Sequence, residues 1–210
     1  MKKLLFSALF LFSVFISEAQ VRFGFKAAPN ISFNRIDAEA DNTDFNTEGV
    51  GLRFQLGPIF DFEFKENHYF STGIIFTSKR SAFSADSTIT TPPTSYKEDY
   101  SPQYLQVPIT LKLFTEEIGL DKKIYFQFGG TIDFMTNSEG EDENIVQSFR
   151  FIDLNSLLAV GMEYGIGINT KLFGGLIYQR GLLNAINKNI YGDSFKLRND
   201  FVGLEVGIIF

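Results

Sequence analysis

The chain has 210 residues and a formal net charge of −6 at pH 7, and it contains neither cysteine nor tryptophan. The missing cysteine excludes both a disulfide framework and an N-terminal lipid anchor. The acidic balance argues against a nucleic-acid partner, because contacts to phosphates need a basic face. Phenylalanine and glycine are abundant, with 25 and 18 residues, and this combination is typical of β-rich barrels.

Residues 1–19 have the pattern of a secretory signal peptide. Two lysines precede an apolar run over residues 4–16, and small residues follow at the two positions that a signal peptidase reads. The run is shorter than the roughly 20 residues of a membrane-spanning helix. We therefore expect cleavage after Ala19 and a mature domain over residues 20–210, in which no apolar run is long enough for a helical span. The signal peptide holds two of the 19 basic and one of the 25 acidic residues, which leaves 17 and 24 and a net charge of −7.

The first part of the mature domain alternates between expected strands and connections. Residues 21–33 and 50–64 alternate apolar with small or polar side chains, a period of two that no amphipathic helix produces. The polar, acidic residues 34–48 between them predict a long loop. Residues 65–67 predict a tight turn, and residues 68–78 predict the returning strand.

The middle of the chain repeats this arrangement. Residues 79–102 are rich in serine, threonine and proline, and they are expected to be loop rather than core. Alternation returns over residues 104–114 and 124–135, with a short turn over residues 116–122 between them. Residues 137–144 carry an acidic run and predict a third long loop.

The last part of the chain predicts a hairpin and a closing strand. Residues 151–168 and 172–179 form the hairpin, which turns near residues 169–170, and residues 181–197 form a long connection. Residues 201–210, FVGLEVGIIF, alternate in hydropathy up to the terminal phenylalanine. An unpaired apolar edge strand would template aggregation. We therefore expect this strand to pair with the first strand and close a barrel.

These patterns predict an all-β fold of about eight strands. The connections run long, short, long, short, long, short, long. An outer-membrane barrel with both termini in the periplasm has this regularity, because its periplasmic turns are short and its external loops are longer. The prediction is a single antiparallel up-and-down transmembrane β-barrel, preceded by a cleaved signal peptide.

Alternation alone leaves open which face is outside, since a soluble barrel of the lipocalin type has its apolar face inward. The other face decides, because it is rich in small polar residues with sparse charges of both signs, as in the interior of a narrow barrel. The lipocalin Gly-x-Trp signature is also absent. The charges expected inside are Arg53, Asp61, Glu63, Lys112, Asp133, Glu163 and Glu205. Buried charges need partners, so we expect Arg53 to contact Glu205 or Asp133 and Lys112 to contact Glu163.

One segment carries a family resemblance. Residues 104–112, YLQVPITLK, resemble the Tyr-Leu-x-[Ile/Val]-Pro-Leu-x-x-Lys strand of the PorT-like outer-membrane β-barrel family of Bacteroidetes. The signal ending in Ala19-Gln20 and the terminal Phe210 also match. The resemblance implies a small barrel of the OmpA and OmpX class in the outer membrane, inserted by the barrel-assembly machinery. It also implies a role in protein secretion for the founding member of the family, which does not transfer with the barrel alone.

The sequence offers no set of catalytic residues. The single histidine, His68, follows a short turn, and no serine and aspartate stand near it at a triad spacing. Residues 41–44 and 139–144 hold oxygen ligands without the spacing of a calcium loop. We therefore predict no catalytic, cofactor-binding or metal-binding residues and no cofactor.

The expected function is a non-enzymatic outer-membrane barrel that displays four extracellular loops. A barrel of about eight strands is filled by its own side chains, here by Arg53, Lys112, Tyr125, Gln127 and Met135. Residues 79–102 are the longest expected loop and the predicted contact surface for secretion or surface partners. The expected lipid partners are outer-membrane lipid and lipopolysaccharide. The alternatives are a PorT-like component of a secretion or assembly system and a narrow channel or transporter.

Overall fold

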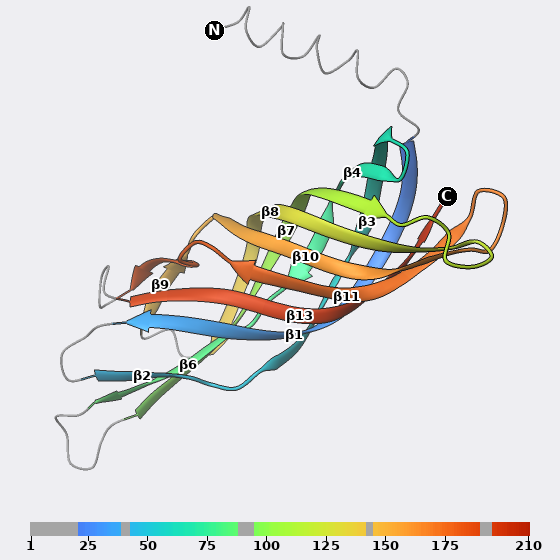
Figure 1. Cartoon of the computed structure of the whole chain (residues 1–210). Coiled ribbons are helices and arrows are strands. Elements are labelled where there is room, and N and C mark those ends of the chain that lie inside the picture. The colour runs from blue at the N-terminus through green and yellow to red at the C-terminus, as the bar shows by residue number, and fades with distance from the viewer. Residues whose placement is uncertain (1–20, 39–42, 88–94, 142–144, 190–194) are drawn as a thin grey trace, which may run out of the picture.

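The computed structural model describes residues 21–38, 43–87, 95–141, 145–189 and 195–210. The expected signal peptide over residues 1–19 lies outside these ranges. Strands make up the described chain (Figure 1). In chain order they are β1 (Val21–Ala38), β2 (Thr43–Thr47), β3 (Gly51–Lys65), β4 (His68–Gly73), β5 (Ile75–Ser78), β6 (Ser81–Ser87), β7 (Ser95–Phe114), β8 (Lys122–Glu141), β9 (Val146–Phe149), β10 (Ile152–Gly165), β11 (Lys171–Gly181), β12 (Ile186–Asn189) and β13 (Phe195–Ile209). A helix of the length and hydropathy needed to span a bilayer does not occur among the described residues.

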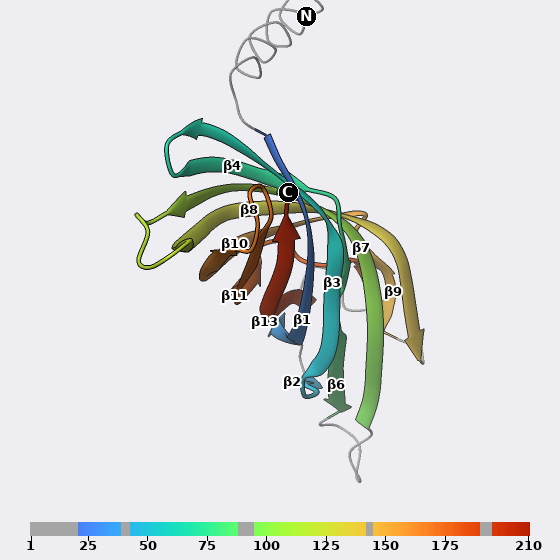
Figure 2. The same ribbon diagram turned by 90° about the vertical axis from the view of Figure 1, so that its right-hand side faces the viewer.

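The antiparallel pairings of the main sheet close on themselves. The ring runs from β1 through β3, β4 with β5, β7, β8, β10, β11 and β13, and then back to β1. It has eight strand positions in the described chain, because β4, β5 and β6 follow one another as one interrupted strand and β2 precedes β3 in the same way. Figure 2 shows β13, β1 and β3 side by side at the point of closure. The predicted pairing of the first and last strands is therefore confirmed, as is the up-and-down barrel.

The connections are sorted by end of the barrel. The turns at residues 66–67, 115–121 and 166–170 lie at one end, where Val21 and Phe210 also lie. The strand ends that flank the other connections, including those of β6 with β7 and of β8 with β9, lie at the opposite end (Figure 1). We call these the turn end and the loop end.

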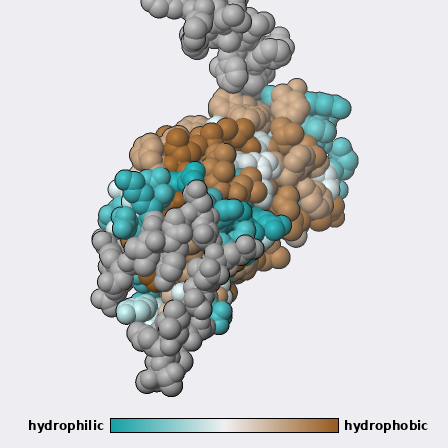
Figure 3. All heavy atoms as spheres, turned by 90° about the vertical axis from the view of Figure 1, so that its left-hand side faces the viewer, coloured by the Kyte–Doolittle hydropathy of each residue, from teal (hydrophilic) through white to brown (hydrophobic). Residues whose placement is uncertain are grey.

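The side chains follow the predicted orientation, with apolar groups outside and polar groups inside. Leu204 is 58% exposed on the outer wall, whereas its neighbour Glu205 is 1% exposed in the interior. Asp61, Gln106 and Asp133 are likewise buried in the interior. Figure 3 shows apolar side chains over the barrel wall and hydrophilic ones around the loop end. A wall of this kind has to face a hydrocarbon solvent, because the contiguous apolar patches on a water-soluble monomer are far smaller.

The predicted long loops are in large part strand, which corrects the sequence analysis. Residues 34–38 and 43–47 belong to β1 and β2. Residues 79–102 contain β6 and the first part of β7, which begins at Ser95. Residues 137–141 extend β8, and β12 and the start of β13 fall within residues 181–197. The physical reason is that these strands continue beyond the apolar wall. Their outer face there meets water and is polar, so the alternation in hydropathy that marks a membrane strand fades while the pairing continues.

Candidate functional site

The barrel interior near the turn end contains a network of ion pairs. The Arg22 guanidinium donates to Asp61 and to Glu163, each at 3.0 Å, and Lys112 contacts Asp61 at 3.3 Å. The rings of Tyr69 and Phe114 lie 4.2 and 5.1 Å from the same guanidinium. Two cations therefore share Asp61, and Glu163 is held by Arg22 and by Lys171 at 3.1 Å.

The partner predicted for Lys112 was wrong, although the prediction that it contacts an inward carboxylate was right. Lys112 is 2% exposed and pairs with Asp61, and Glu163 pairs with Arg22 instead. No role was predicted for Arg22 from the sequence. The alternation of the first strand could have indicated that Arg22 points inward, because Arg22 shares a face with Gly24 and Lys26.

A second part of this network contains Lys26, Glu205 and Tyr125. Lys26 contacts Glu205 at 3.1 Å, and the Tyr125 hydroxyl donates to the other carboxylate oxygen at 2.7 Å. Tyr125 is fully buried and lies against the backbone of Gly161 and Gly175, where an added methyl group would collide with its hydroxyl end. These glycines make room for the ring, as expected for a crowded interior.

The interior toward the loop end contains a separate network around Lys79. Its ammonium group contacts Asp133 and Asp153, each at 2.9 Å, and donates to the side-chain oxygen of Asn155 at 3.0 Å. The side chain of Lys79 is 1% exposed. The prediction that residues 79–102 are loop rather than core was wrong at this residue, because Lys79 is a central buried cation of the barrel. Amide side chains extend the network, with Gln106 donating to Asp133 at 2.9 Å.

Arg53 corrects a further prediction. Its guanidinium donates to the backbone oxygen of Lys79 at 3.2 Å and to the Ser101 hydroxyl at 2.9 Å, and no carboxylate among the described residues pairs with it. Asp133 and Glu205, the expected partners, pair with Lys79 and Lys26. The sequence predicted correctly that the Arg53 side chain points inward. It did not predict the position of Arg53 along the barrel axis, which decides the partners.

An apolar layer separates the two networks. It contains Ala28, Ile59, Ile75, Leu157, Ala159, Ile177 and Phe201. On β3 the order is Gln55, Ile59 and Asp61, so the layer lies between the amide network and the charged network. The same order holds on β10, where Leu157 lies between Asn155 and Glu163. The interior is therefore filled, and on β7 and β8 the buried Thr110, Gln127 and Thr131 continue the polar side chains past this layer.

The loop end has its own hydrophobic core, which we call the outer cap. Its buried members are Phe83, Ala85, Tyr100, Ile145, Val146, Phe149, Ala185, Ile186, Phe195 and Leu197. They come from β6, β7, the β9–β12 pair and the start of β13. Phe195 lies 5.0 Å from the ring of Phe83 and 4.8 Å from that of Phe45. Strand segments that were expected to be separate loops thus pack into one unit.

A buried carboxylate ties the cap together. Glu98 is 2% exposed, and it accepts hydrogen bonds from the backbone N–H of Ile145 at 2.5 Å and from the Tyr100 hydroxyl at 2.7 Å. The backbone N–H of Val146 donates to it at 3.3 Å. One side chain of β7 thereby holds the chain that leads into β9.

His68 lies where the sequence placed it, beside the short turn after β3. Its ring nitrogen Nδ1 is 2.7 Å from the backbone oxygen of Glu66, and its ring packs against Phe64. The described residues contain no group of three side chains with the arrangement of a metal site. Of the acidic segments considered for calcium, Asp44 is an exposed residue of β2, and residues 142–144 lie outside the described ranges.

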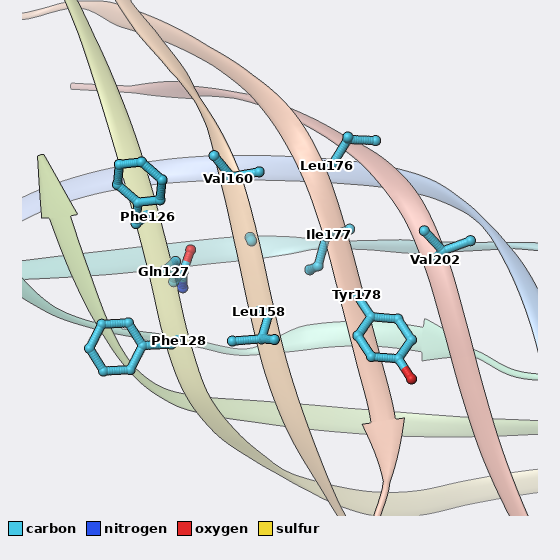
Figure 4. A pocket seen from close by; sticks show the side chains of 10 residues that line it. Phe126, Gln127, Phe128, Leu158, Val160, Leu176, Ile177, Tyr178 and Val202 are labelled. Carbon is cyan, nitrogen blue, oxygen red and sulfur yellow. The ribbon is translucent and has the colours of Figure 1, made fainter. Parts of the chain in front are cut away.

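The outer wall contains a groove of about 470 Å³ across β8, β10, β11 and β13 (Figure 4). Its lining residues are Phe126, Gln127, Phe128, Leu158, Ala159, Val160, Leu176, Ile177, Tyr178 and Val202. All but Gln127 and the Tyr178 hydroxyl are apolar, so the groove suits a hydrocarbon chain.

Sequence comparison agrees with this geometry, since the outer membrane protein beta-barrel domain family matches residues 17–187. The chain belongs to this family. The match ends before β13, the strand that closes the ring. No curated protein matches the sequence. Membership in this outer-membrane β-barrel family implies residence in the outer membrane of a Gram-negative cell.

The chain is similar to solved structures at low sequence identity. Neisserial surface protein A is 12% identical with a TM-score of 0.50, over 92% of this chain and 100% of that chain. OprG from Pseudomonas aeruginosa is 13% identical with a TM-score of 0.47, over 90% of this chain and 94% of that chain. The likeness to Neisserial surface protein A places this outer-membrane β-barrel among the small barrels by fold alone.

Proposed function

We propose that this protein is a non-enzymatic outer-membrane barrel with a closed interior, which presents the outer cap at the cell surface as a contact surface for other proteins. The observation that carries the proposal is the filled interior. Two ion-pair networks and the apolar layer between them occupy the space that a pore would need. Scaffolds of this kind present function on the segments beyond the membrane.

Single-channel recording in planar bilayers tests the closed interior. The purified barrel should give no large, stable conductance. The control is a variant in which the apolar layer is opened by Ile177→Gly and Leu157→Gly, and this variant should leak more than the wild type if the layer is the seal. A large steady conductance of the wild-type protein would replace this proposal with the narrow channel or transporter.

The orientation follows from the proposal, with the turn end and both termini in the periplasm. The chain has no cysteine, so single cysteines report on it cleanly. Leu120 is 85% exposed at the turn end, and Asn46 is exposed at the loop end. A membrane-impermeant maleimide should label Asn46→Cys in intact cells and Leu120→Cys only after permeabilisation. The reverse pattern would contradict the orientation.

A PorT-like component of a secretion system is the second candidate, and the resemblance of residues 104–112 favours it. These residues lie in β7, in the barrel wall. We expect partners to contact the loop end and the barrel-assembly machinery to insert the chain through its last strand. Replacing residues 88–94 by a short glycine linker preserves the pairing of Asp86 with Ser95. Loss of secretion partners on co-purification of this folded variant would support the candidate, and their unchanged recovery would oppose it.

A further inference from the structure

Basic side chains gather on the outer wall at the loop end, above the apolar surface. Arg35 of β1 pairs in register with Arg198 of β13, and Lys196 pairs with Asp37. Arg180 of β11 pairs with Asp200 of β13. These positions alternate with inward-facing residues, so their side chains share the outer face of three adjacent strands. We call Arg35, Arg180, Lys196 and Arg198 the basic rim.

Neighbouring carboxylates balance only part of this charge. Asp200 binds Arg35 at 2.7 Å, and Gly181 O fixes the same guanidinium at 2.8 Å. Arg198 has only a 3.9 Å contact with Asp37, whose side chain is 64% exposed. Arg180 is exposed and forms no ion pair within the described chain. Arg35 and Arg198 face each other directly, an arrangement of like charges that is unfavourable without a counterion.

The apolar groove of Figure 4 begins directly below the rim. Tyr178 and Val202 line the part of the groove toward the loop end and pair with each other in register. Arg180 is the next outward position after Tyr178 on β11. A single ligand therefore meets hydrocarbon side chains along the wall and, at the loop end, the guanidinium groups of Arg180 and Arg198, of which only Arg198 has a carboxylate contact, at 3.9 Å.

We propose that a phosphorylated glycolipid of the outer leaflet binds here, with its phosphate on Arg180 and Arg198 and an acyl chain in the groove. Guanidinium groups bind phosphate oxygens through paired, charge-assisted hydrogen bonds. The wall of the barrel lies in the bilayer, so the groove meets acyl chains rather than soluble ligands. The assignment to the outer leaflet rests on the proposed orientation, whereas the binding chemistry does not.

The test is native mass spectrometry of the detergent-solubilised, folded barrel titrated with diphosphorylated lipid A and with its dephosphorylated form. The wild type should retain the phosphorylated lipid preferentially. Arg180→Gln and Arg198→Gln should each weaken its binding about fivefold, since each basic residue near an anionic lipid surface raises the affinity by about that factor. The control Lys65→Gln removes the same charge at the turn end and should have no effect.

The groove is tested separately by filling it. Val160→Trp should weaken binding of the phosphorylated lipid, whereas Leu56→Trp, on the exposed wall of β3, should not. Arg180→Lys keeps the charge without the paired geometry and should lie between Arg180→Gln and the wild type. Equal retention of the two lipids, or equal losses in Lys65→Gln and Arg180→Gln, would overturn the proposal. The assay uses purified protein, so an error in the proposed orientation would alter the maleimide pattern without altering this result.

Discussion

The Lys79 network provides the sharpest test of how the interior is stabilised. Lys79→Met keeps the length of the side chain but removes the cation that Asp133 and Asp153 share, each at 2.9 Å. The variant leaves two buried carboxylates without their partner, and breaking a buried pair in this way costs about 3–5 kcal/mol. We expect a loss of this size in the free energy of unfolding, measured by urea titration in lipid vesicles with cold and heated gels as the readout of folded barrel.

Two controls make the experiment decisive. Lys97→Met removes a cation that is 69% exposed and pairs with Glu48 at 3.3 Å, and exposed pairs contribute only about 0–1 kcal/mol. Combining Lys79→Met with Asp133→Asn and Asp153→Asn removes the unpaired charges and should recover most of the loss. If Lys79→Met were as stable as Lys97→Met, the interpretation of Lys79 as a central buried cation would be refuted.

Three further predictions test other parts of the structure. Arg22→Gln removes the cation shared by Asp61 and Glu163 and should cost about 3 kcal/mol or more in the same titration. Arg53→Gln, whose partners are neutral, should cost about 1 kcal/mol. Equal losses would contradict the assignment of Arg22 as the shared buried cation. Gly161→Ala should destabilise the barrel by about 1–3 kcal/mol through overpacking. Adding Tyr125→Ala should remove the part of the clash that involves the ring and leave the contact with the backbone oxygen of Gly174, so a double variant showing simple additivity would speak against a clash with the ring. Glu98→Ala strips the partner from buried N–H groups, at about 1–3 kcal/mol each, and hydrogen exchange at the start of β9 should accelerate while the barrel strands stay protected.

Alternation in the sequence was sufficient to predict the strands within the membrane, their orientation and the closure by residues 201–210. It failed for the ion pairs, because a period of two gives the side of the wall but not the height of a residue along the barrel. Height depends on the register of every pairing around the ring, which is why Lys112 meets Asp61 and why Arg53 lies beyond both of its expected partners.

The sequence also understated the loop end. Lys79 was placed in a loop because the residues after it are rich in serine, threonine and proline, although the chain there continues as β6. The cap assembles from five separate segments whose apolar residues, such as Phe83 and Phe195, are individually sparse. The basic rim was missed for the same reason, since Arg35, Arg180 and Arg198 are distant in sequence and become neighbours only through strand pairing.

The seam between β1 and β13 has a consequence for how the chain can be rearranged. The backbone N–H of Phe210 donates to Phe23 O at 2.7 Å, so the start of β1 and the last residue of the chain are bonded neighbours. A brief peptide bridge between them, with new ends cut into the exposed turn at residues 166–170, would give a circular permutant in which the old seam becomes an ordinary hairpin. Such a permutant should still form the ring, because no strand position depends on where the polypeptide starts.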